Sequence, residues 1–142
     1  MTVAWCVALA ACYVPHIPAE PTGTRVELGC VALGVAFRGD DVARGPIVVY
    51  RFVNRCDHRA VIDLASVRVL ARDTAGREVA LAAYDPDREL RALPLPARLD
   101  GVEAIEYRGL ERADIASLCV DVGGIAAGAP RAARWICDGA PR

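Results

Sequence analysis

Residues 47–54, with the sequence IVVYRFVN, place the strongest constraint on how this chain folds. Alternate positions of the segment are large and apolar, and Arg51 falls on the opposite face. The apolar positions are Val48, Tyr50 and Phe52. A period of two is typical of a β-strand with one buried face. Residues 54–59 then contain the turn formers Asn and Asp, and residues 60–64 form a second apolar run. Strand, polar turn and strand is the repeating unit of an antiparallel β-sandwich.

The rest of the chain carries the same pattern in short segments separated by turn-forming residues. We expect strands at residues 30–38, 47–54, 60–64, 67–72, 77–82, 102–107, 118–122 and 132–137. We expect Trp135 to fill the core, residues 73–76 to form a tight turn, and residues 110–116 to form a helical turn or a closing loop. Residues 93–96 read LPLP and do not fit a central strand, because two prolines remove donors from the ladder. The pattern predicts an all-β, immunoglobulin-like antiparallel β-sandwich of about seven or eight strands over residues 25–142.

The composition fits one domain and argues against one class of partner. A chain of 142 residues is long enough for a hydrophobic core without a metal. The formal net charge is −1, from 17 basic residues, all of them arginine, and 18 acidic residues. A strongly basic face would therefore require an equally acidic face elsewhere, and we expect no nucleic-acid partner.

The N-terminal residues resemble an export signal. Residues 3–11 are an unbroken apolar run that is too short to span a membrane but compatible with the hydrophobic region of a secretory signal. The run ends in Leu9-Ala10-Ala11-Cys12, which resembles the lipobox of bacterial lipoproteins. That resemblance implies a signal peptide over residues 1–11, cleavage before Cys12 and diacylation of the Cys12 sulfur.

The segment departs from the usual signal in one respect, because residues 1–11 contain no Lys or Arg. The alternative is a buried N-terminal strand or helix in which Cys12 is incidental.

Residues 12–24 carry spaced prolines, which favour a semi-extended tether. Two acyl chains suffice for stable anchoring in a membrane. Tyr13 is not Asp, so the sorting rule of enteric lipoproteins favours the outer membrane over the inner membrane.

Four cysteines remain when Cys12 and the expected signal peptide are set aside: Cys30, Cys56, Cys119 and Cys137. An even number suits two disulfides in an oxidising cell envelope, and four cysteines allow three pairings. A hairpin closed near residues 41–46 brings Cys30 close to Cys56. A second hairpin, turning near Gly128, brings Cys119 opposite Cys137. We therefore favour the pairs Cys30–Cys56 and Cys119–Cys137.

Other patterns give weaker indications of chemistry. Zinc ligation involving His58 is the alternative to the disulfides, although the chain has no CxxC or HxxxH spacing. Residues 85–89, DPDRE, are similar to the start of a calcium loop but lack its Gly and closing Glu, so we expect a solvated turn. We expect no function for the tripeptide Arg38-Gly39-Asp40, and we expect Asp63 to face outward or cap a turn. No common hydrolase or nucleotide motif occurs, and we expect no metal or cofactor.

The order of features resembles small immunoglobulin-like domains of bacterial envelope proteins. The matching parts are the strand ending at Asn54, the polar turn, the strand through residues 63–64, the turn at 73–76 and residues 101–107. This resemblance implies no catalytic residues. We expect a non-enzymatic, lipid-anchored envelope protein that binds another envelope protein through strand edges or end loops. One alternative is a soluble secreted or periplasmic inhibitor or ligand-binding sandwich. The other is an enzyme of unrecognised type, which the lack of a visible acid–base constellation disfavours.

Overall fold

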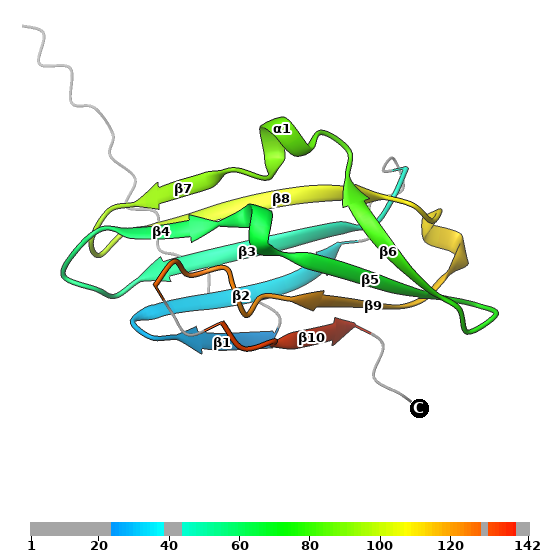
Figure 1. Ribbon diagram of the computed structural model, residues 1–142, viewed down its shortest axis with the longest axis horizontal. Helices are drawn as coiled ribbons and strands as arrows, with labels where there is room; N and C mark the ends of the chain where they lie inside the picture. Colours follow the sequence, from blue (N-terminus) through cyan, green and yellow to red (C-terminus); the bar gives the residue numbers. More distant parts are fainter. Residues whose placement is uncertain (1–23, 39–43, 129–130, 139–142) are drawn as a thin grey trace, which may run out of the picture.

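A computed structural model of the protein describes residues 24–38, 44–128 and 131–138. Eight antiparallel strands follow one another in the order β1-β2-β3-β8-β6-β5-β9-β10 (Figure 1). The first layer contains β1 (Thr24–Leu28), β2 (Val31–Arg38), β3 (Ile47–Asn54) and β8 (Asp100–Arg108). The second layer contains β6 (Glu78–Ala83), β5 (Arg68–Asp73), β9 (Ile115–Asp121) and β10 (Trp135–Asp138). Between β6 and β8 the layers are joined by the residue pairs Ala82↔Arg108 and Ala83↔Tyr107.

The remaining described elements cover one edge and the ends of the two layers. A separate two-stranded sheet pairs β4 (Ala60–Asp63) with β7 (Ala92–Leu95). The short helices are η1 (Leu64–Ser66), α1 (Pro86–Glu89) and η2 (Arg112–Asp114). The two outer strands of the eight-strand order, β1 and β10, lie on the same side of the molecule (Figure 1), and Arg134 Nη1 donates to Glu27 O at 3.0 Å.

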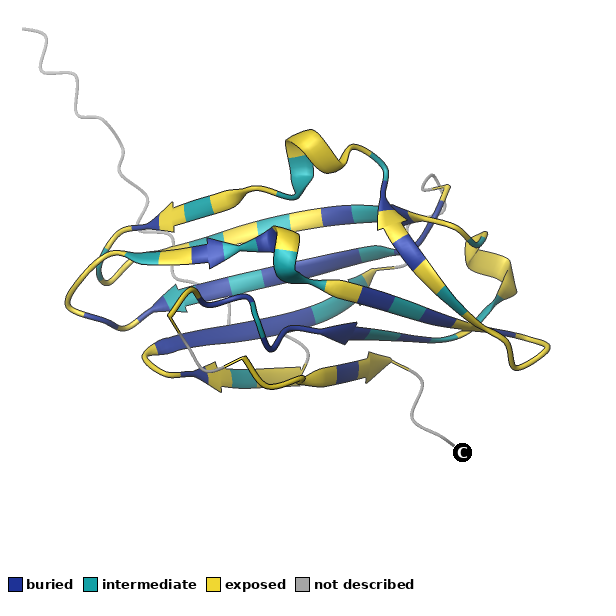
Figure 2. Ribbon diagram, viewed as in Figure 1, coloured by how far each residue is buried: buried dark blue, intermediate teal, exposed yellow. Residues whose placement is uncertain are grey.

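The core lies between the layers and follows the alternation seen in the sequence. Buried residues run along β2, β3 and β9, as the dark blue bands of Figure 2 show. The first layer contributes Leu33, Val35, Val48, Tyr50, Phe52 and Ile105 to the core. The second layer contributes Val69, Ala71, Leu118, Val120 and Ile136, and the β4 side contributes Ile62, Leu64 and Ile125. Burying such side chains on two facing sheets supplies most of the driving force for folding.

The predicted all-β antiparallel sandwich is confirmed. The described residues form ten strands, of which eight overlap the predicted segments, whereas β1 and β7 are additional. The expected hairpin of β5 and β6 around residues 73–76 is present. The strand order begins with the meander β1-β2-β3. Residues 93–95 belong to β7, which has β4 as its strand partner and lies outside the eight-strand order, as the prolines require.

Two local expectations need correction. Trp135 does not fill the core but is 43% exposed, because the β10 register turns Ile136 inward beside Val120. The guanidinium of Arg68 lies 5.7 Å from the centre of the exposed indole ring. Strand β1 begins at Thr24, where the predicted tether ends, and was not predicted from the sequence.

Candidate functional site

A groove of about 520 Å³ opens at the end of the sandwich where β1 turns into β2. Three separate segments line it: the β1–β2 turn at residues 28–31, residues 56 and 58–61 leading into β4, and residues 126–128. Most of the lining is apolar, with Leu28, Val31 and Ala126 buried at its base and Val61 37% exposed at its edge. Volumes of this size are typical of small-molecule sites.

The β1–β2 turn places Cys30 at the groove. Leu28 pairs with Val31 across a two-residue turn, and Gly29 adopts a positive φ of 65°. A glycine at the first central position is characteristic of the hairpin turn whose twist matches that of the strands. The turn leads directly to the Cys30–Cys56 disulfide, whose Cα atoms lie 5.2 Å apart. Arg55 N also donates to Cys30 O at 2.9 Å, so the turn and the β3–β4 loop are held together by two independent links.

Asn54 holds the other side of the site in place. Its side chain is buried, and its Oδ1 accepts a hydrogen bond from Cys56 N at 2.9 Å. Its Nδ2 lies 3.0 Å from the carbonyl oxygens of His58, Leu95 and Pro96. The sequence identifies Asn54 as a turn former, and the structure shows that it also fastens the β3–β4 loop to the end of β7.

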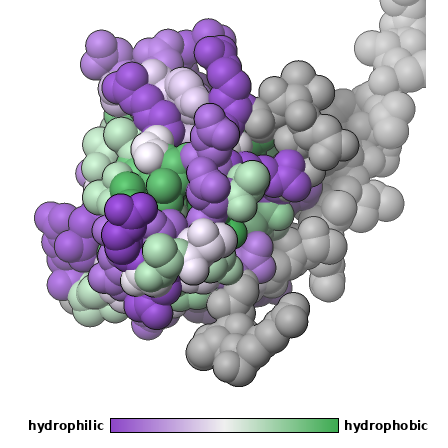
Figure 3. All heavy atoms as spheres, turned by 90° about the vertical axis from the view of Figure 1, so that its right-hand side faces the viewer, coloured by the Kyte–Doolittle hydropathy of each residue, from purple (hydrophilic) through white to green (hydrophobic). Residues whose placement is uncertain are grey.

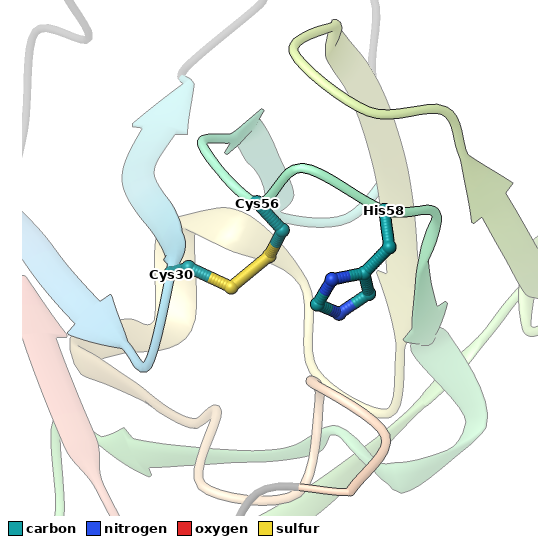
Figure 4. Close-up of side chains that lie close together, drawn as sticks. All are labelled: Cys30, Cys56 and His58. Atoms are coloured by element: carbon teal, nitrogen blue, oxygen red, sulfur yellow. A yellow bond between two sulfur atoms is a disulfide. The ribbon is translucent and has the colours of Figure 1, made fainter.

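His58 lies beside the disulfide at the edge of the groove (Figure 4). The sulfurs of Cys30 and Cys56 and one ring nitrogen of His58 all lie within 4.8 Å of one another. Because the two sulfurs are bonded to each other, neither is a thiolate, and the zinc-ligating alternative would require the reduced dithiol. The Nδ1 atom of His58 lies 2.8 Å from Asp57 Oδ1, and this hydrogen bond lowers the pKa of the Asp57 carboxyl.

Arg59 is the one arginine among the described residues that line the groove. Its side chain is exposed, and among residues 24–38, 44–128 and 131–138 it has no ion-pair partner. The carboxylate of the same loop, Asp57, is bonded to His58 and also experiences the charge of Arg98. The groove therefore combines an apolar base with one arginine that has no ion-pair partner in the described ranges.

A second cavity, of about 380 Å³, lies at the opposite end of the sandwich. Its apolar lining includes Phe37, Ile47, Ile115 and Leu118, from β2, β3 and β9. Figure 3 looks at this end and shows an apolar area surrounded by hydrophilic side chains. Arg38, Arg112 and Asp138 contribute both signs of charge, and each of them has interactions within the protein.

The buried charged groups of the described chain serve the fold. Asp121 Oδ1 accepts from Gly123 N at 3.0 Å and from Arg134 N at 2.7 Å, and its Oδ2 is paired with Arg68. Burial alone would raise the pKa of Asp121, but these hydrogen bonds outweigh it and lower the pKa. Asp73 lies in the β5–β6 turn, where hydrogen bonds from the backbone and side chain of Arg77 lower the pKa of its carboxyl.

The structure contains both favoured cysteine pairs, Cys30–Cys56 and Cys119–Cys137. Cys119 and Cys137 lie directly opposite each other on β9 and β10. Asp63 caps η1 through a hydrogen bond from Ala65 N to its Oδ1, one of the two roles expected for it. Residues 86–89 form the exposed helix α1, where Glu89 Oε2 accepts from Asp85 N.

Several predicted sites lie outside the described residues. Cys12, its lipobox and residues 12–23 of the predicted tether belong to residues 1–23, and the tripeptide at 38–40 is described only at Arg38. Sequence reasoning did not find the groove itself. Its third wall, residues 126–128, is a run of small residues without alternation, and no local signal shows that it pairs with β4 through Ala127 N and Val61 O at 3.0 Å.

Comparison with protein-family models, with curated proteins and with solved structures finds no match. Within the described ranges, no helix has the length and apolar character needed to cross a membrane.

Proposed function

We propose that this chain is a non-catalytic cell-envelope protein whose β-sandwich binds a partner at the end that carries the Cys30–Cys56 disulfide. Under this proposal, lipid on Cys12 holds the protein to the membrane, preferentially the outer membrane. The partner is another envelope protein, and the groove end provides the contact surface.

The observation that carries the proposal is the pair of disulfides in one small sandwich. Each disulfide joins neighbouring strands or turns at one margin of the fold, and disulfides of this kind persist in oxidising compartments. A disulfide that closes a loop of this length typically adds about 3 kcal/mol to the free energy of unfolding. The buried carboxylates Asp73 and Asp121 are bound in structural hydrogen bonds, which favours a binding role over an acid–base role.

The groove also favours a second candidate function, in which the β-sandwich binds a small ligand. An apolar concave surface with a few polar groups is the usual form of a ligand site. In this form the protein works at the membrane surface or as a soluble periplasmic or secreted module. The two candidates share the site and differ in what occupies it.

A photocrosslinking experiment tests binding at the groove end. A photoreactive residue replaces Val61, which is 37% exposed at the groove, and in a matched control it replaces Val102, which is 51% exposed on β8 and does not line the groove. We expect a discrete cross-linked envelope protein from position 61 and none from position 102. Equal cross-linking from both positions would contradict the assignment of the contact surface.

The anchor is tested separately by the substitution Cys12→Ser. We expect the unsubstituted protein in the membrane fraction and the variant in the soluble part of the envelope, with both disulfides retained. A variant that stays in the membrane fraction would show that Cys12 is not the anchor.

A further inference from the structure

We propose that the groove beside the Cys30–Cys56 disulfide binds an alkyl carboxylate, with the alkyl chain on the apolar base and the carboxylate on Arg59. This inference rests on the ligand-binding form of the proposed function and names the class of its ligand.

The base of the groove provides a surface for the alkyl chain. Leu28 and Val31 flank the β1–β2 turn, Ala126 comes from the segment 126–128, and all three line the groove with their side chains largely removed from solvent. Val61 extends this apolar surface to the edge, where it remains 37% exposed. An exposed apolar side chain continuous with an apolar groove is a site at which an alkyl chain removes further surface from water.

The walls of the groove are held firmly before any ligand arrives. The disulfide and the hydrogen bond from Arg55 N to Cys30 O join the first wall to the second. The hydrogen bond from Ala127 N to Val61 O, together with that from Asp63 N to Ile125 O at 2.7 Å, joins the second wall to the third. A groove that is already formed avoids much of the entropic cost of ordering its walls on binding.

The charges at the groove select the head group. Arg59 lines the groove and has no ion-pair partner in the described ranges, whereas Asp57 is bonded to His58. A guanidinium matches a carboxylate with two parallel hydrogen bonds. An alkylammonium ligand would meet Arg59 as a like charge, and an uncharged alcohol would forgo the ion pair. The groove therefore fits an alkyl carboxylate better than either analogue.

The test is a titration of the full chain carrying Cys12→Ser with decanoate, followed by NMR of the backbone amides. The substitution removes the expected acyl chains, which would compete for the groove. We expect saturable shifts at residues 28–31, 56–61 and 126–128. Decanol and decylammonium, which have the same alkyl length, should bind more weakly than decanoate.

Two substitutions of exposed arginines provide the matched comparison. Arg59→Gln should raise the decanoate Kd by about three- to tenfold, the range expected for a partly exposed charged hydrogen bond. It should leave decanol binding unchanged. Arg88→Gln, on helix α1 and outside the groove, should change neither value.

Other outcomes would overturn the inference in distinguishable ways. Equal binding of decanoate and decanol, unaffected by Arg59→Gln, would overturn the carboxylate while leaving a ligand groove in place. Shifts centred on Phe37 and Leu118 would place the ligand in the cavity at the opposite end. No shifts with any of the three probes would refute an alkyl ligand, whereas the cross-linking from position 61 would still decide the protein-binding function.

Discussion

The hydroxyl oxygens of Tyr50 and Tyr107 lie 2.8 Å apart inside the core, where both side chains are buried. Tyr50 lies on β3, and Tyr107 lies near the end of β8, where β8 also pairs with β6. Each hydroxyl is therefore the hydrogen-bond partner of the other, at a position that is shielded from water. This hydrogen bond joins the centre of one layer to the point at which the two layers meet.

We expect Tyr107→Phe to lower the free energy of unfolding by about 1–3 kcal/mol, because it leaves the Tyr50 hydroxyl buried without its partner. Tyr50→Phe should have a similar effect. The double variant should cost less than the sum of the single variants, since no hydroxyl is then left unpaired. Urea unfolding of all four proteins measures the coupling, and additive losses would contradict a direct hydrogen bond.

The same pair predicts how stability changes in alkali. Burial, with a smaller contribution from the charge of Glu89, raises the pKa of Tyr107 to about 12, although the hydrogen bond with Tyr50 opposes the rise. An unfolded tyrosine titrates near pH 10. Between about pH 10 and about pH 12 the native state keeps protons that the unfolded state loses, so the free energy of unfolding falls as pH rises.

The chain contains no lysine, so side-chain ammonium groups do not titrate in this range. We expect denaturant titrations across it to show the fall, and we expect Tyr107→Phe to reduce its slope. If the free energy of unfolding falls with pH at the same slope in both proteins, other groups cause the fall.

Asp121 predicts the behaviour in acid. Its carboxyl is only 6% exposed and its pKa is lowered, so the stability that it provides is fully present above about pH 4. That stability is lost as pH falls through the lower native pKa, because the unfolded state binds the proton first. Asp121→Asn should lower the free energy of unfolding at neutral pH by about 1–3 kcal/mol. It should also reduce the loss of stability as pH falls, which thermal unfolding at several acidic pH values measures. An unchanged loss of stability in acid would contradict this role.

Gly45 is predicted to tolerate no side chain. A Cβ atom at this position would lie 1.9 Å from the carbonyl oxygen of Tyr107, where the start of β3 approaches β8. Gly45→Ala should therefore lower the free energy of unfolding by about 1–3 kcal/mol or more through forced backbone displacement. Gly101→Ala is the control, since its nearest neighbour would be Leu95 Cδ1 at 3.5 Å, an ordinary contact. Equal losses in chemical denaturation would contradict the close approach.

The strands in which apolar and polar residues alternate could be predicted from the sequence. The inward face of residues 47–54 and the apolar positions of 118–122 are buried as expected, because a period of two records which face a strand buries. The hairpin of β5 and β6 also follows from its local turn. The cysteine pairs follow from hairpins that bring distant residues opposite each other.

Features that depend on a distant partner could not be predicted in this way. Strand β1 exposes Arg25 and Glu27 and carries only two large apolar residues, Val26 and Leu28, so its alternation is short and directly follows the proline-containing segment. The pattern around Trp135 does not show which of two adjacent apolar residues the register turns inward. The groove is assembled from three segments, and its third wall is in place only when residues 126–128 pair with β4.

We propose above all that the protein is an exported, lipid-anchored and disulfide-bonded domain, and one measurement tests this proposal most directly. This is the intact mass of the protein purified from native membranes, with and without reduction before alkylation. We predict a chain that begins at Cys12 and carries acyl groups, with thiols that become alkylated only after reduction. The thiols concerned are those of Cys30, Cys56, Cys119 and Cys137. An unacylated chain whose cysteines are alkylated without reduction would contradict the claim.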